Sequence, residues 1–145
     1  MNRLRVRHAR PHDTERVIEI EHACFTNPNP TLLGNVCGIV DGFLVAENDE
    51  GVVGYVLFTP SSASNARVLS LAVAPGHRRQ GVATRLLHGA FDVLRDRDFD
   101  SVGLEVRVSN DAAGSLYDEL GFVPVGIEKE YYDDGEDAYL MEKKL

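Results

Sequence analysis

The chain contains no tryptophan and only two cysteines among its 145 residues. Two cysteines cannot build a disulfide-rich scaffold. Cys24 and Cys37 match neither a CxxC pair nor a zinc-site spacing, and the five histidines form no HExxH pattern. We therefore expect no metal site, and we expect both cysteines to be ordinary small apolar residues.

Long apolar runs and lysines are also scarce. No run approaches the roughly 18 residues of a membrane span, and the N-terminal sequence MNRLRVRHARPHD lacks the apolar region of a signal peptide. We therefore expect a cytoplasmic protein with no membrane partner. The formal net charge of −8 argues against a nucleic-acid partner, because phosphate backbones attract basic surfaces. Three lysines accompany twelve arginines, which fits either a GC-rich genome or an acidic, salt-adapted surface.

What is present suffices for one folded domain. Hydrophobic residues make up 43% of the chain, and no internal repeat or linker interrupts it. Periodicity, turn residues and capping residues predict the order β-α-α-β-β-β-α-β-α-β-β, with a polar loop over residues 61–66. The predicted strands cover residues 4–8, 43–47, 52–58, 68–73, 101–108, 122–128 and 138–143. The predicted helices cover residues 12–24, 82–94 and 110–120, together with a short helix that begins at Pro30, includes Val36 and ends before Asp41. This order implies a single α/β (α+β) domain, residues 1–145, with helices flanking a mixed, largely antiparallel sheet.

The most informative segment is VLSLAVAPGHRRQGVATRLLHGAFDVL, residues 68–94. Three alternating apolar residues predict a half-buried strand there, namely Leu69, Leu71 and Val73. Gly81 and Ala83 remove side-chain bulk at the following turn, where the unpaired amides of a helix start can bind an anion. Arg78 and Arg79 add positive charge, and Arg85 is expected one turn further along. A diphosphate fits this turn.

These residues carry a resemblance to a known family. The run Arg78-Arg79-Gln80-Gly81-Val82-Ala83 matches the [RQ]-x-x-G-x-[GA] signature of the GNAT superfamily of N-acetyltransferases. The downstream blocks LEVRVSNDAAGSLYDELGF and YYDDGEDAYLMEKKL resemble the ribosomal-protein N-terminal alanine acetyltransferases (the RimI type) and their archaeal relatives. The resemblance extends over nearly the whole chain and is weakest between Phe25 and Gly42. It implies a GNAT-like fold with a central splay between two strands.

The resemblance also implies acetyl-CoA as the co-substrate. Its pyrophosphate would bind the turn, and the Val73 amide would hold the thioester oxygen as that oxygen gains charge. His77 lies in the same turn and is a further candidate for a CoA contact. The cofactor-binding residues that the resemblance implies are Leu71, Ala72, Val73, Arg78, Arg79, Gln80, Gly81, Val82, Ala83, Thr84, Asn110 and Tyr117.

Glu105 and Tyr117 are the candidate catalytic residues. A carboxylate on a covered strand can accept the amine proton directly or through water, and the resemblance places the general base at Glu105. The alternative is a glutamate on a solvated face, paired with Arg107 or Arg79. Tyr117 follows Asn110 by two helical turns, so its phenol could protonate the CoA sulfur, unless it is simply a core residue.

The sequence allows two interpretations of the role of each of three other residues. Asn110 can cap a helix, bind the pantetheine arm, or do both. Tyr131 and Tyr132 resemble the tyrosine-rich segment that borders the acceptor groove in protein N-terminal acetyltransferases, and a β-edge aromatic pair is the alternative.

No serine or cysteine lies in a nucleophile elbow, which favours direct transfer over an acyl-enzyme.

The acceptor is inferred from proton chemistry. An α-amino group with a pKa of about 8 is about one tenth neutral at pH 7, whereas a lysine with a pKa of about 10.4 is neutral in well under about one part in a thousand. One glutamate base therefore suits a protein N-terminus, in agreement with the resemblance. Alternatives are a small amine (a polyamine, an amino acid or an aminoglycoside) or a non-catalytic CoA-binding module. The protein is expected to be a monomer or a homodimer.

Overall fold

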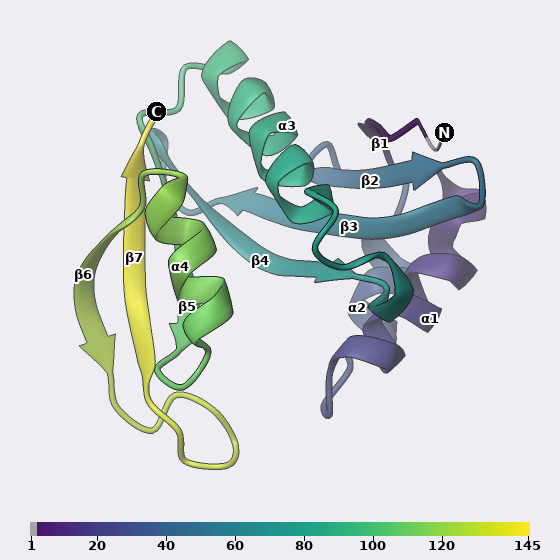
Figure 1. Ribbon diagram of the computed structural model, residues 1–145. Helices are drawn as coiled ribbons and strands as arrows, with labels where there is room; N and C mark the ends of the chain where they lie inside the picture. Colours follow the sequence, from purple (N-terminus) through teal and green to yellow (C-terminus); the bar gives the residue numbers. More distant parts are fainter. Residues whose placement is uncertain (1–2) are drawn as a thin grey trace. The chain divides into compact units, whose positions relative to one another are not determined.

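The computed structural model describes residues 3–145 (Figure 1). Within these residues the strands are β1 (Arg5–His8), β2 (Phe43–Asn48), β3 (Gly51–Pro60), β4 (Asn65–Val73), β5 (Ser101–Arg107), β6 (Val123–Glu128) and β7 (Ala138–Lys144). The helices are α1 (Thr14–Cys24), α2 (Pro30–Val36), α3 (Val82–Asp96) and α4 (Asp111–Glu119), with 3-10 turns η1 (Pro11–Asp13) and η2 (Pro75–His77). The predicted order of strands and helices is confirmed. The predicted domain also includes Met1 and Asn2, which lie outside the described residues.

The hydrogen-bonded strand order is β1-β2-β3-β4-β5-β7-β6. Strands β4 and β5 pair in parallel, whereas the pairs β1–β2, β2–β3, β5–β7 and β6–β7 are antiparallel. The prediction of a mixed, largely antiparallel sheet is therefore confirmed.

The chain forms two compact units. The first contains the residues through Phe58 together with Leu69–Val93, and the second contains Thr59–Val68 and Leu94–Leu145. Strand β4 contributes its N-terminal half to the second unit and its C-terminal half to the first.

The core of the first unit is built around β2, which is buried on both faces. Phe43 and Val45 pack on one side with residues of α1 and α2, among them Val17, Ile20 and Leu33. On the other side, Leu44 lies against α3 at Gly89, where an added Cβ would come within 3.2 Å of the leucine. Figure 1 shows α3 on the opposite side of β2 and β3 from α1 and α2. Because helices cover both sides, β2 reads as a continuous apolar run rather than an alternating one.

Strand β4 buries a different face from the predicted one. Val68 and Ala72 are buried, whereas Leu69 is 49% exposed and Leu71 and Val73 are only partly buried. Both faces of this strand carry apolar residues, so alternation alone could not separate them. Ala72 is the residue that joins the core of the first unit.

The start of β4 also differs from the prediction. Residues 65 and 66 were expected in a polar loop, but β4 begins at Asn65 because Asn65–Arg67 pair with Ser101–Gly103 of β5. A long-range strand pairing of this kind overrides the local turn preference of a Ser- and Asn-rich segment.

In the second unit, β5 alternates between a buried and a partly exposed face. Val102, Leu104 and Val106 are buried, whereas Glu105 and Arg107 are partly exposed. Strand β7 lies between β5 and β6.

Helix α4 of the second unit ends as predicted, with Gly121 at φ +95°. Figure 1 shows this helix beside β5 and β7. None of the helices in residues 3–145 combines the length and the apolar character that a membrane crossing requires.

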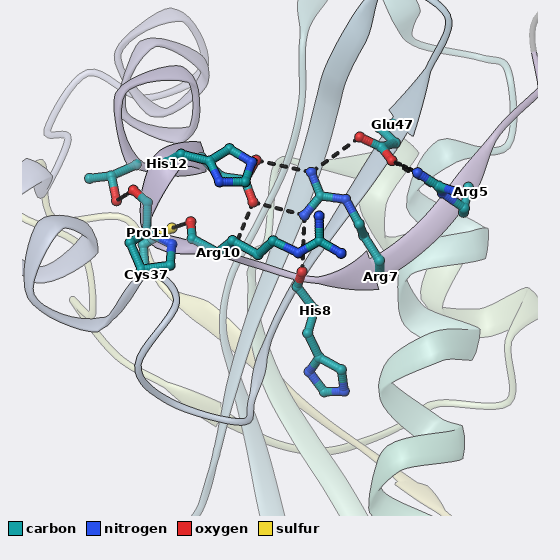
Figure 2. Close-up of polar contacts among 10 residues, drawn as sticks. Arg5, Arg7, His8, Arg10, Pro11, His12, Cys37 and Glu47 are labelled. Carbon is teal, nitrogen blue, oxygen red and sulfur yellow. Dashed lines mark hydrogen bonds and ion pairs between the residues drawn. The ribbon is translucent and has the colours of Figure 1, made fainter.

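A partly buried arginine connects β1, η1 and β2 (Figure 2). Arg7 donates from Nη1 and Nη2 to the two carboxylate oxygens of Asp13 at 2.8 and 3.0 Å, and from Nη2 to Glu47 Oε2 at 3.1 Å. Asp13 also accepts the Arg10 backbone N–H at 2.7 Å, and Arg5 pairs with Glu47. Hydrogen bonds from Arg7 lower the pKa of Asp13 and, with those from Arg5, lower the pKa of Glu47 to about 2.

This cluster predicts a specific loss of stability in acid. Both carboxyl groups have a lower pKa in the folded protein than in the unfolded chain, so their contribution is present above the ordinary pKa values of 3.8 and 4.5 and is lost as pH falls through the folded values. The free energy of unfolding should therefore fall more steeply between about pH 5 and about pH 2 in the wild type than in the Asp13→Asn/Glu47→Gln variant. Urea titrations at several pH values measure this difference.

Glu19→Gln is the matched control, since Glu19 is 62% exposed and lies 3.9 Å from Arg16 on the surface. It should leave the acid dependence unchanged. Equal pH dependence in the wild type and the double variant would contradict the prediction.

Candidate active site

The turn between β4 and α3 has the backbone of an anion site. Arg79 and Gly81 have positive φ angles of 61° and 79°. The Arg85 N–H donates to the Gly81 carbonyl at 3.0 Å, so the amides of Val82–Thr84 precede the helical hydrogen bonds of α3. A Cβ on Gly81 would meet no atom within 4 Å. An open space therefore lies at an amide-rich helix start, which favours an anionic ligand.

The arginines near this turn are not equivalent. Arg78 turns back toward the end of β4, where it donates to the Val73 carbonyl at 3.3 Å and contacts Cys24 Sγ at 3.4 Å. Arg79 is exposed on the turn. Arg85, which the sequence places one turn further along the helix, donates to the Leu4 carbonyl at 3.0 Å. Its guanidinium therefore contacts the segment that precedes β1.

The His77 side chain contacts a hairpin of the first unit. Its ring nitrogens lie 3.5 Å from Asn48 Nδ2 and 3.9 Å from Glu50 Oε2, so the side chain contacts the β2–β3 hairpin. The sequence could not reveal this contact because the hairpin is distant along the chain.

Glu105 lies on the partly exposed face of β5 with 14% of its side chain exposed. It forms an ion pair through Oε1 with Nη2 of Arg67 on β4, and not with Arg107 or Arg79. The same Arg67 nitrogen donates to the Tyr131 hydroxyl at 3.2 Å. The candidate base and a candidate acceptor tyrosine therefore share one arginine.

The segment that follows Glu130 is held against the end of β5. Tyr131 and Tyr132 stack edge to face with ring centroids 4.9 Å apart, and the Arg107 guanidinium lies 4.0 Å from the Tyr132 ring centre. Arg107 also pairs with Asp134 at 2.8 Å and with Glu136 at 2.9 Å. The two tyrosines thus belong to a structured turn and not to a strand edge.

Helix α4 carries the remaining candidates. Asn110 caps it, since Oδ1 accepts the Ala113 N–H at 3.1 Å. Tyr117 packs edge to face on Phe122 with ring centroids 5.7 Å apart, and burial raises the pKa of Tyr117 to about 12. A phenol of that pKa is a poor donor to a free thiolate, whose conjugate thiol has a pKa of about 8.5. Any proton transfer from Tyr117 must therefore accompany the cleavage of the C–S bond.

The structure groups the predicted residues by unit. In the first unit, Leu71–Val73 lead directly into the turn that contains Arg78–Thr84. In the second unit, Glu105 and the two tyrosines form one cluster. A pocket of about 440 Å³ beside α4 has Asn110 in its lining but not Tyr117, so this pocket does not unite the two.

A buried carboxylate in the first unit escaped the sequence analysis. Glu21 is 6% exposed, accepts the Tyr55 hydroxyl at Oε1 and accepts the Asn29 N–H at Oε2 at 2.9 Å. The Tyr55 hydroxyl also lies 3.0 Å from Ser70 Oγ, and burial raises the pKa of that phenol. Glu21 thereby ties the α1–α2 loop to β3 and β4. Its place on the apolar face of α1, four residues after Val17, was the available signal.

The comparisons with known proteins agree with this geometry. The model of the family described as "Acetyltransferase (GNAT) family" matches residues 11–122. The chain is 36% identical to the N-alpha-acetyltransferase of Sulfurisphaera tokodaii, with 97% of this chain and 93% of that protein covered. The structure of Ard1 from Thermoplasma volcanium superposes with a TM-score of 0.91 at 30% identity over 98% of this chain and 97% of that one. The ribosomal-protein-S18-alanine N-acetyltransferase of Escherichia coli superposes with a TM-score of 0.84 at 28% identity over 99% and 94%.

The turn predicts different outcomes for two neighbouring glycines. Gly81→Ala should lower the free energy of unfolding by about 1 kcal/mol, because a side chain is strained at positive φ, whereas Gly76→Ala should be nearly neutral. Gly76 is the matched control, with open space around it and no positive φ. Gly81→Glu, which adds a carboxylate at the expected anion site, should in addition abolish CoA binding in calorimetry. Wild-type CoA affinity in Gly81→Glu would move the anion site elsewhere.

Proposed function

Because the chain belongs to the GNAT family and is an acetyl-CoA-dependent N-acetyltransferase, we propose that its acceptor is the N-terminal α-amino group of a protein. The observation that carries the proposal is the contact of Arg67 with both Glu105 and the Tyr131 hydroxyl. This contact joins the carboxylate that we propose as the base to a tyrosine that we propose for the acceptor site, which supports the proposal. The names of similar proteins, which include an N-alpha-acetyltransferase and a ribosomal-protein-alanine acetyltransferase, support the same acceptor class.

The cofactor half of the proposal rests on the first unit. Backbone amides of residues 79–84 would hold the pyrophosphate of acetyl-CoA, with charge supplied by Arg79. The strand residues Leu71–Val73 would bind the pantetheine and thioester end. In the second unit, Asn110 would contribute its amide N–H groups, which its capping role leaves available. Residues 1–145 would act as one N-acetyltransferase domain, and the family match supports this because it includes residues of both units.

The proposed chemistry is direct transfer. Glu105 accepts a proton from the α-ammonium group, directly or through water, and the neutral nitrogen attacks the thioester carbonyl. The Val73 N–H stabilises the oxygen as it gains charge. As the C–S bond breaks, Tyr117 donates its proton to the departing sulfur, and the second proton that the attacking nitrogen loses returns to the Tyr117 oxygen through water. Tyr117→Phe keeps the aromatic ring and tests this last role, since turnover should fall while CoA affinity is kept.

The acceptor class predicts the outcome of a substrate panel. Acetyl-CoA is incubated with peptides that begin with Ala, Ser, Met or Glu, with an N-terminally blocked lysine peptide, and with free polyamines. At least one free N-terminus should be acetylated with the highest kcat/KM, because its amine is far more often neutral at pH 7. Mass spectrometry locates the acetyl group. Preferred acetylation of a polyamine or of the lysine side chain would overturn the proposed acceptor.

The proposed base predicts the kinetics of Glu105→Gln. The amide keeps the shape of the side chain but cannot take a proton, so kcat should fall by about 100-fold or more while CoA affinity stays near the wild-type value. The deficit should shrink as pH rises, because more of the acceptor is neutral before it binds. Glu19→Gln is the control, since Glu19 lies on α1 of the first unit and is 62% exposed. Wild-type turnover in Glu105→Gln at pH 7 would leave Glu105 a structural charge.

A further inference from the structure

We propose that Arg67 is the positioning residue of the Glu105 base. The inference rests on the proposed function, since it assigns a role toward the carboxylate that the proposed function uses. Arg67 would act through Glu105 by fixing which oxygen faces the acceptor. It would not take part in the proton transfer itself.

Strand register explains how Arg67 reaches the carboxylate. Arg67 is the parallel-sheet partner of Gly103, and Gly103 and Glu105 lie on the same face of β5 because they are two residues apart. This pairing places Arg67 beside the position two residues before Glu105, within reach of the Glu105 carboxylate.

The contacts of Arg67 orient the carboxylate. Nη2 engages Oε1 of Glu105 and also donates to the Tyr131 hydroxyl, so one nitrogen fixes both groups. With Oε1 held by the guanidinium, Oε2 is the oxygen left to receive the proton. The ion pair raises the pKa of Arg67 against the opposing effect of burial, so the guanidinium stays charged and is no candidate for acid–base catalysis.

The contacts of the nearby arginines favour Arg67 over Arg107 as the residue that positions Glu105. Arg107 lies on the same strand and face as Glu105, but its guanidinium is taken by Asp134, Glu136 and the Tyr132 ring. Arg67 Nε is buried without a hydrogen-bond partner, so the arginine is held by its terminal nitrogen and not by a wider network. Within the described residues, Arg67 is the arginine that forms an ion pair with Glu105.

Stability alone does not account for the pair. Asn65–Arg67 and Ser101–Gly103 are already joined by backbone pairing, and the Arg67 side chain is 41% exposed, against 14% for Glu105. Water that reaches the Arg67 side of the pair screens its attraction and limits its contribution to the free energy of unfolding. We therefore expect loss of the contact to change kcat more than it changes the free energy of unfolding.

A double-mutant cycle on kcat tests the inference. Arg67→Met, which keeps the apolar stem and removes the guanidinium, is made in the wild type and in Glu105→Gln. In the wild type kcat should fall by at least about fivefold with KM for acetyl-CoA unchanged, and in the Glu105→Gln background the further fall should be under about twofold. Arg67→Lys should restore part of the rate, because an ammonium can still contact one oxygen.

One further variant and one stability measurement serve as controls for the cycle. Tyr131→Phe removes only the hydroxyl contact and should leave most of the Arg67 effect in place. Urea unfolding of Arg67→Met identifies any loss of folding, in which case Arg67→Lys and Arg67→Gln replace it in the cycle.

The possible failures are distinguishable. If Arg67→Met slows both backgrounds equally while Glu105→Gln is itself slow, Arg67 acts independently of the base and only the present inference is overturned. If Glu105→Gln has the wild-type rate, the base assignment of the proposed function fails first and the positioning role falls with it.

Discussion

The need to cover both faces of β2 organises the first unit. Phe43 and Val45 require α1 and α2 on one side, and Leu44 requires α3 on the other. Each such side chain contributes about 1.5–3 kcal/mol when fully buried, so the helices cannot leave these faces without a large loss of stability. Packing of α3 in turn fixes where its N-terminus lies relative to the end of β4. The turn at Gly81, with its open space and unpaired amides, is thus a product of core packing.

Three arginines each contact two or more polar or aromatic partners through the guanidinium group, an arrangement that we call an arginine fork. Arg7 joins Asp13 to Glu47, Arg67 joins Glu105 to Tyr131, and Arg107 joins the Tyr132 ring to two carboxylates. Each guanidinium serves two or more partners at once, which a planar group with five donors does better than an ammonium. The excess of arginine over lysine therefore has a structural use here, whatever its origin in genome composition or salt adaptation. In a chain with a net charge of −8, these forks also keep neighbouring carboxylates from repelling one another.

The sequence anticipated the family, the order of elements and the turn at Gly81 because each depends on residues close together in the chain. Alternating strands, helix caps such as Asn110 and the C-terminal Gly121 are local features. The alternation pattern predicted the wrong buried face for β4. Val68 and Ala72 on one face and Leu71 and Val73 on the other are equally apolar, so the pattern could not separate the two faces. The local sequence also placed Asn65 in a loop, because pairing with Ser101 cannot be read from a turn-forming segment.

The sequence by itself determined that this chain is a GNAT acetyltransferase, since the family signature over residues 78–83 is one contiguous run of residues with its own backbone requirements. It also named Glu105 as a candidate base. Only the tertiary structure decided that Arg67 is the partner of Glu105, that Arg85 contacts Leu4 and His77 contacts the β2–β3 hairpin, and that Glu21 is buried and accepts a hydrogen bond from the α1–α2 loop. Long charged side chains reach several ångströms from their backbone, and their partners are set by strand register and helix packing. Strand register and helix packing bring together residues that are distant in sequence, and local sequence patterns carry no information about either.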